Sequence, residues 1–156
     1  MSRAFLLGMI LVASACASAQ PAERTAPPTA LAPDTLASRL LTAAMQEASA
    51  SIEAYESVIE AAEEDRSDAQ NRARQRVLTA ALAAERGETL LRIRFAMFGG
   101  PPSDTEGQLR VYLSFLATGA DDLLEVDAID PAALRTFLPD LTDPLREILA
   151  ALSPDE

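Results

Sequence analysis

The chain contains no histidine, no lysine and no tryptophan, and Cys16 is its only cysteine. Without histidine it lacks the commonest general base and the imidazole metal ligand, and a serine triad would have no base. Without lysine there is no Schiff-base chemistry, and a lone cysteine forms neither an intrachain disulfide nor a thiolate metal cluster. We therefore expect a protein that is not an enzyme and that holds no metal and no cofactor.

Aromatic residues make up only 4% of the chain, whereas hydrophobic residues make up 49%. The core must therefore consist mainly of leucine and alanine, which head the helix-propensity scale. All basic residues are arginines, and the formal net charge is −11. Such a charge repels phosphate backbones, so nucleic acid is not an expected partner.

The first 19 residues have the features of an export signal peptide: Arg3, an apolar run at residues 4–12 and small residues up to Ala19. The apolar run is shorter than the roughly 20 residues that span a bilayer. Two processing routes stay open, namely cleavage after Ala19 and lipidation of Cys16 within the box formed by residues 13–16. Both predict a protein exported to the periplasm, with membrane contact only through the lipid anchor of the second route.

Residues 20–33 contain four prolines and no hydrophobic period, which is typical of an extended linker. Residues 34–156 are expected to form a single helical domain. Within it, an apolar stripe predicts a long helix that begins at an Asp34 N-cap and ends near residue 63. Ser67 and Gln70 form a capping box for a second helix, which is expected to end before Gly99 because two glycines and two prolines follow.

These two helices should pair as an antiparallel hairpin, since the first is rich in glutamate and the second in arginine. The register predicts ion pairs of Glu60 with Arg72 or Arg74 and of Glu56 with Arg76. Arg94 lies at the far end of the hairpin, and its partner is expected from the acidic C-terminal third. Exposed pairs contribute only about 0.2–1 kcal/mol each, so they select the register rather than stabilise the hairpin.

A third helix is predicted from a capping box of Ser103 and Glu106 to a stop at Gly119, followed by a short acidic segment. Asp130-Pro131 and Asp143-Pro144 are expected to begin two short helices, with Pro139 ending the first. The predicted fold is an all-α small helical bundle. The alternative is a pair of strands at residues 89–98 and 108–117, because parts of both alternate between apolar and polar residues.

Four groups of side chains are candidates for a functional site. The first three, each with a simpler structural explanation, are a calcium-binding cluster, a paired-carboxylate site and an anion site. The calcium-binding cluster would consist of Asp121, Asp122, Glu125, Asp127 and Asp130. The paired-carboxylate site would consist of Glu60, Glu63 and Glu64, and the anion site of Arg72, Arg74 and Arg76. Helix N-terminal acids and ion pairs within the hairpin explain these residues as well.

The fourth group is apolar: Phe95, Met97, Phe98, Tyr112, Phe115 and Phe137. We expect these residues in the core, because large apolar side chains are usually buried. Any that stay exposed would form a docking surface for a partner helix or an apolar ligand. The predicted function is that of a non-enzymatic cell-envelope protein that binds or scaffolds a protein partner. The alternative is a carrier of a small apolar or lipid-like ligand.

Overall fold

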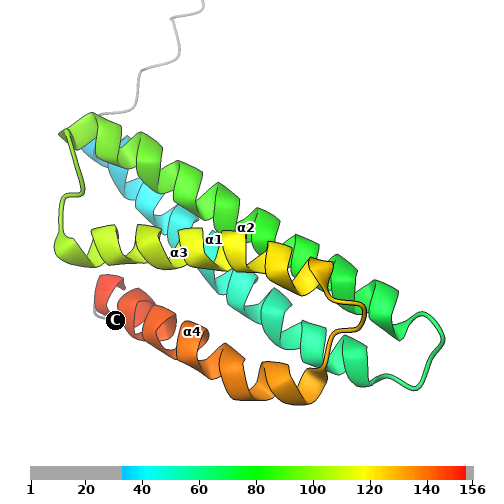
Figure 1. Ribbon diagram of the computed structural model, residues 1–156. Coiled ribbons are helices and arrows are strands. Elements are labelled where there is room, and N and C mark those ends of the chain that lie inside the picture. Colours follow the sequence, from blue (N-terminus) through cyan, green and yellow to red (C-terminus); the bar gives the residue numbers. More distant parts are fainter. Residues whose placement is uncertain (1–32, 154–156) are drawn as a thin grey trace, which may run out of the picture. The chain divides into compact units, whose positions relative to one another are not determined.

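The computed structural model describes residues 33–153, which form four α-helices and contain no strand (Figure 1). The all-α prediction is confirmed, and the alternative with strands at residues 89–98 and 108–117 is wrong, since both segments lie entirely within helices. No helix within residues 33–153 is long and apolar enough to cross a bilayer. The proposed leader with Cys16, and the linker up to residue 32, lie outside the described residues. The helices are α1 (Pro33–Glu63), α2 (Ala69–Phe98), α3 (Asp104–Glu125) and α4 (Pro131–Leu152).

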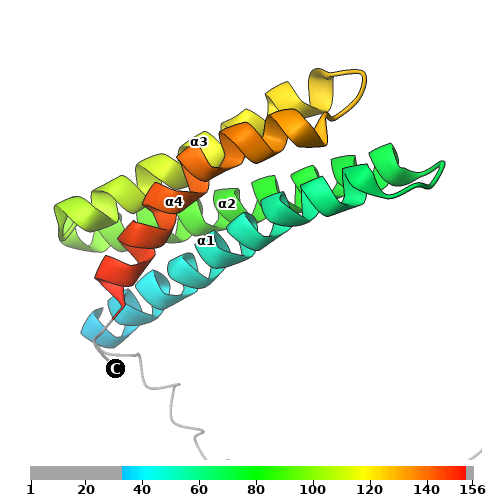
Figure 2. The ribbon, with the colours of Figure 1, turned by 90° about the horizontal axis from the view of Figure 1, so that it is seen from below.

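Successive helices run antiparallel, as the colours of Figures 1 and 2 show. Helix α1 packs mainly against α2 and α4, and α3 packs mainly against the same two helices. The arrangement is an up-down-up-down bundle. The hairpin helices have 31 and 30 residues, whereas α3 and α4 have 22 each. At a rise of about 1.5 Å per residue, α3 and α4 are too short to cover the hairpin along its full length.

The hairpin is packed through a seam of small residues. Its fully buried alanines include Ala44, Ala48, Ala73, Ala80 and Ala84. Gly87 extends this seam, because a Cβ atom there would lie 3.0 Å from Leu113 Cδ1 and 3.3 Å from the carbonyl oxygen of Ala44. The backbones of α1 and α2 approach closely because no side chain separates them at these positions.

The N-terminal ends of α1 and α2 differ from the predicted caps. Helix α1 begins at Pro33, so Asp34 lies inside its first turn. Helix α2 has Asp68 at its N-cap position, without a side-chain capping hydrogen bond. The Gln70 amide instead donates to the Ile129 carbonyl oxygen (3.2 Å) and accepts from the Ile129 N–H (2.8 Å). The predicted capping box is wrong because this tertiary partner takes both ends of the glutamine amide.

The caps of α3 and α4 agree better with the sequence. The Ser103 hydroxyl accepts from the Glu106 N–H at 3.2 Å, and the Asp130 carboxylate accepts from the Ala132 N–H at 2.9 Å. The Glu106 carboxylate does not complete the Ser103 box. It forms two hydrogen bonds with the Arg94 guanidinium, of 2.6 and 3.0 Å, and both side chains are buried. The partner of Arg94 therefore comes from the C-terminal third, as predicted.

Three predicted helix boundaries are wrong: the ends at Gly119 and Pro139 and the start at Asp143-Pro144. Helix α3 continues through Gly119 to Glu125, and α4 is one helix that contains both Pro139 and Pro144. Each proline removes one backbone donor, yet an unbroken buried face continues past both. This face consists of Leu134, Leu138, Thr142, Leu145 and Ile148. Burial of that face offsets the lost hydrogen bonds, so the tertiary context overrides the local stop signals.

The two predicted hairpin ion pairs are also wrong. Glu56 pairs with Arg146 of α4, and Arg72 pairs with Glu64 close to the α1–α2 turn. Another arginine of α4, Arg135, pairs with Glu63. The acidic face of α1 therefore binds arginines of α4 as well as of α2. The predicted register considered only the two hairpin helices, so it could not predict the pairs with α4.

Candidate functional site

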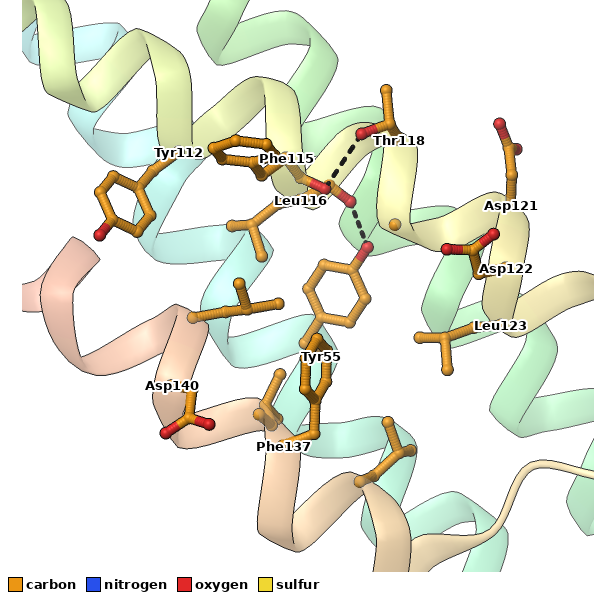
Figure 3. Close-up of a pocket in the computed structure, with 14 residues that line it drawn as sticks. Tyr55, Tyr112, Phe115, Leu116, Thr118, Asp121, Asp122, Leu123, Phe137 and Asp140 are labelled. Atoms are coloured by element: carbon orange, nitrogen blue, oxygen red, sulfur yellow. Dashed lines mark hydrogen bonds between the residues drawn. The ribbon is translucent and has the colours of Figure 1, made fainter.

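An open groove of about 900 Å³ lies between α3 and α4, with Tyr55 of α1 at its base (Figure 3). It runs along residues 112–123 of α3 and residues 134–141 of α4. Its lining is mainly apolar and comprises Tyr55, Tyr112, Phe115, Leu116, Thr118, Gly119, Asp121, Asp122, Leu123, Leu134, Phe137, Leu138, Asp140 and Leu141.

Two phenylalanines from facing helices border this groove. Phe115 of α3 is 58% exposed and Phe137 of α4 is 54% exposed. In Figure 3, Phe115 extends from α3 and Phe137 extends from α4. Paired large aromatic side chains in a solvent-accessible hollow are a feature of binding surfaces rather than of an ordinary protein exterior.

Tyr55 joins α1 to α3 beneath the groove. Its side chain is buried, and its hydroxyl donates to the Leu116 carbonyl oxygen. Burial, together with the negative charge of Asp121, raises the pKa of Tyr55 to about 12. Because the hydroxyl is already bonded to α3, Tyr55 offers the groove its ring. The sequence analysis assigned Tyr55 only to the apolar stripe of the first helix. The one sequence signal for its contact with α3 is that a buried phenol needs a hydrogen-bond partner.

Three exposed carboxylates stand along the groove: Asp121 and Asp122 on α3, and Asp140 on α4. None of them forms an ion pair with another residue of the described part. No arginine lines the groove. Its apolar surface is therefore flanked by unneutralised negative charge on both helices.

The candidate apolar residues divide between several environments. Phe95 is buried as predicted, but the expectation of a core position is wrong for Phe98, Phe115 and Phe137, which are more than half exposed. The Arg94 guanidinium carbon lies 5.2 Å from the centroid of the Phe98 ring, a cation–π distance. Met97 is exposed near the end of α2. The groove thus contains three members of the set: Tyr112, Phe115 and Phe137.

The structure separates the charged candidates. Arg72 contacts Glu64 and Asp68. Arg74 instead donates to the last carbonyls of α3 and the residues after it: Leu124 (2.7 Å), Val126 (2.5 Å) and Asp127 (3.0 Å). Arg76 is exposed and forms no ion pair among residues 33–153. Arg72 and Arg74 are therefore engaged by other groups of the protein, and an anion site at these three arginines stays a prediction.

The acidic candidates are separated too. Within residues 33–153 no three carboxylates come close enough together to hold a metal ion. Asp121 and Asp122 flank the groove, whereas Asp130 caps α4. Glu63 and Glu64 have different arginine partners. Glu106 is the one buried carboxylate of the described part, and it is occupied by Arg94.

Comparisons with protein-family models, with curated proteins and with solved structures gave no match to this chain. The interpretation of the groove therefore depends on its own residues.

Proposed function

We propose that the protein is a non-enzymatic component of the cell envelope that is exported to the periplasm and binds a segment of a protein partner in the α3–α4 groove. The observation that carries the proposal is the exposure of Phe115 and Phe137 on opposite sides of one open apolar hollow. Such side chains lose contact with water when an apolar face of a partner covers them, which favours association.

The shape of the groove supports a helical partner. Its lining on α3 extends from residue 112 to residue 123, which corresponds to about 16 Å, or three helical turns. An amphipathic helix placed in a hydrophobic groove buries residues at positions i, i+4 and i+7. Sites for small ligands instead bury roughly 70–90% of the ligand surface, which an open groove does less well.

Export is supported by the leader at residues 1–19. The intact mass of the protein from its native cells tests this part. A chain that begins at Gln20 would establish cleavage after Ala19, and a diacylated chain that begins at Cys16 would establish the lipoprotein route. An unprocessed chain in the cytoplasm would contradict export.

The binding site is tested by photo-crosslinking in intact native cells. A benzophenone amino acid replaces Phe115 or Phe137 in the full chain, and as a control it replaces Leu82 on α2. Leu82 is 54% exposed, as Phe137 is, but lies outside the groove. We expect one and the same protein crosslinked from positions 115 and 137 and not from position 82. Equal labelling from all three positions, or none from the groove, would contradict the proposal.

The carrier function is the second candidate, favoured by the groove volume of about 900 Å³. Native mass spectrometry of the protein from its own cells distinguishes the two. A bound apolar molecule that is lost in the double variant Phe115→Ser/Phe137→Ser would support a carrier. A ligand-free protein that crosslinks to a partner would support protein binding.

A further inference from the structure

We infer that the segment bound in the α3–α4 groove is a basic amphipathic helix, whose apolar face covers Phe115 and Phe137 and whose cationic side chains pair with Asp121, Asp122 and Asp140. The inference rests on the proposed function and specifies the chemistry of the partner.

The placement of the three carboxylates carries the inference. Asp121 and Asp122 belong to one wall of the groove and Asp140 belongs to the other, with the apolar lining between them. A helix lying between α3 and α4 would therefore have an acidic group on each flank. A partner helix complementary to the groove has apolar residues on one face and arginine or lysine at both borders of that face.

Asp121, Asp122 and Asp140 differ from the other unpaired carboxylates of residues 33–153 in that they line the apolar α3–α4 groove. Three carboxylates of α1 are neutralised by arginines of α2 and α4, in the pairs Glu47–Arg86, Glu56–Arg146 and Glu63–Arg135. No arginine lines the groove, so its three carboxylates are left for a partner. A second copy of this chain, with a net charge of −11, would be repelled electrostatically.

The charges act mainly on selectivity and association rate. Pairs at the rim of an interface are partly exposed and individually weak, whereas complementary potentials steer encounter and exclude like-charged partners. Three such pairs should together favour a basic over an uncharged partner by about tenfold. Salt should reduce this preference, because the pairs are screened.

The test uses two helical peptides of about 14 residues, enough for the three turns of the groove. They share one Leu/Phe face and carry either arginine or glutamine at its borders. Binding to the full chain is measured by calorimetry. We expect the arginine peptide to bind about tenfold more tightly than its glutamine twin at low salt, and about twofold more tightly at about 0.5 M salt.

Two charge-matched variants locate the effect. Asp121→Asn/Asp122→Asn/Asp140→Asn should weaken the arginine peptide about tenfold and leave the glutamine peptide unchanged. The control replaces three exposed carboxylates outside the groove that have no ion pair, Glu60→Gln/Glu85→Gln/Glu147→Gln, and should change neither affinity by more than about twofold.

The outcomes separate the two proposals. Equal binding of the arginine and glutamine peptides would overturn the inference and leave groove binding intact. An equal loss of affinity for the arginine peptide in the two charge variants would do the same. Dimerisation of the chain through the groove, abolished by Phe115→Ser/Phe137→Ser, would also overturn it. If neither peptide binds, or if Phe115→Ser/Phe137→Ser binds both peptides as tightly as the wild type does, the groove is not a helix-binding site. The proposed function then fails together with the inference.

Discussion

The α1–α2 hairpin and the α3–α4 pair are both antiparallel helix pairs, but only the first is closed along its seam. In the hairpin, fully buried alanines and Gly87 let the two backbones approach closely. Between α3 and α4, large side chains face one another across an open groove with Phe115 and Phe137 exposed. Small residues at facing positions close a helix pair, and bulky residues at facing positions leave room for another molecule.

The largest expected contrast is between a core and a groove phenylalanine. Phe95→Ala should lower the free energy of unfolding by about 4 kcal/mol, because it leaves a cavity in the core. Phe115→Ala should cost about 1 kcal/mol or less, because more than half of that side chain is already in water. Urea denaturation of both variants measures the difference. Losses of similar size would mean that the groove is closed in solution.

The next contrast concerns the connection between the hairpin and α3. Glu106→Leu leaves the buried Arg94 guanidinium without its carboxylate, and it should cost about 3 kcal/mol of stability. Glu56→Gln, at the half-exposed pair with Arg146, should cost less than about 1 kcal/mol. Adding Arg94→Met to Glu106→Leu should restore much of the loss. A double variant no more stable than Glu106→Leu would show that the loss does not come from the unpaired Arg94 guanidinium.

Alkaline pH tests the contact of α1 with α3 beneath the groove. The folded state raises the pKa of Tyr55 from 10.0 to about 12, so the neutral phenol is favoured by folding. Its contribution is complete below pH 10 and is lost as the pH rises to 12, by about 2–3 kcal/mol. Unfolding experiments should show this loss in the wild type and in Tyr112→Phe but not in Tyr55→Phe. Parallel pH profiles for all three proteins would contradict it.

The smallest contrast compares two helical glycines. Gly119→Ala should stabilise α3 by about 0.5–1 kcal/mol, because a Cβ there meets nothing within 4 Å. Gly87→Ala should instead destabilise the protein by about 1 kcal/mol, because the new Cβ presses on the Ala44 carbonyl oxygen and on buried Leu113. Thermal unfolding of the two variants measures both signs. Stabilisation by Gly87→Ala would show that the hairpin seam is looser than described.

Local sequence signals predicted most of the fold, since they depend on residues a few positions apart. The hairpin, the start of α3 at Ser103 and the start of α4 at Asp130 follow from apolar periodicity and capping. The signals failed where a distant partner competed. Gln70 binds the backbone of Ile129, and α4 continues through Pro139 because its apolar face is buried along its whole length.

The candidate site could be predicted only in part. Periodicity identifies the side of α3 that carries buried Leu109, Leu113 and Leu116, but it does not say how far α4 stands from that side. The exposure of Phe115 depends on this separation, which is a property of the assembled bundle. Tyr55 was missed for the same reason: its role beneath the groove requires α1 and α3 to be placed together.

Hydroxyl-radical footprinting of the phenylalanines, followed by mass spectrometry, tests most directly whether the α3–α4 groove is open in the free protein. We predict strong oxidation of Phe115 and Phe137, comparable with that of exposed Phe98, and strong protection of Phe95. If Phe115 and Phe137 are instead as protected as Phe95, the groove is filled by the protein itself and the proposed binding surface does not exist.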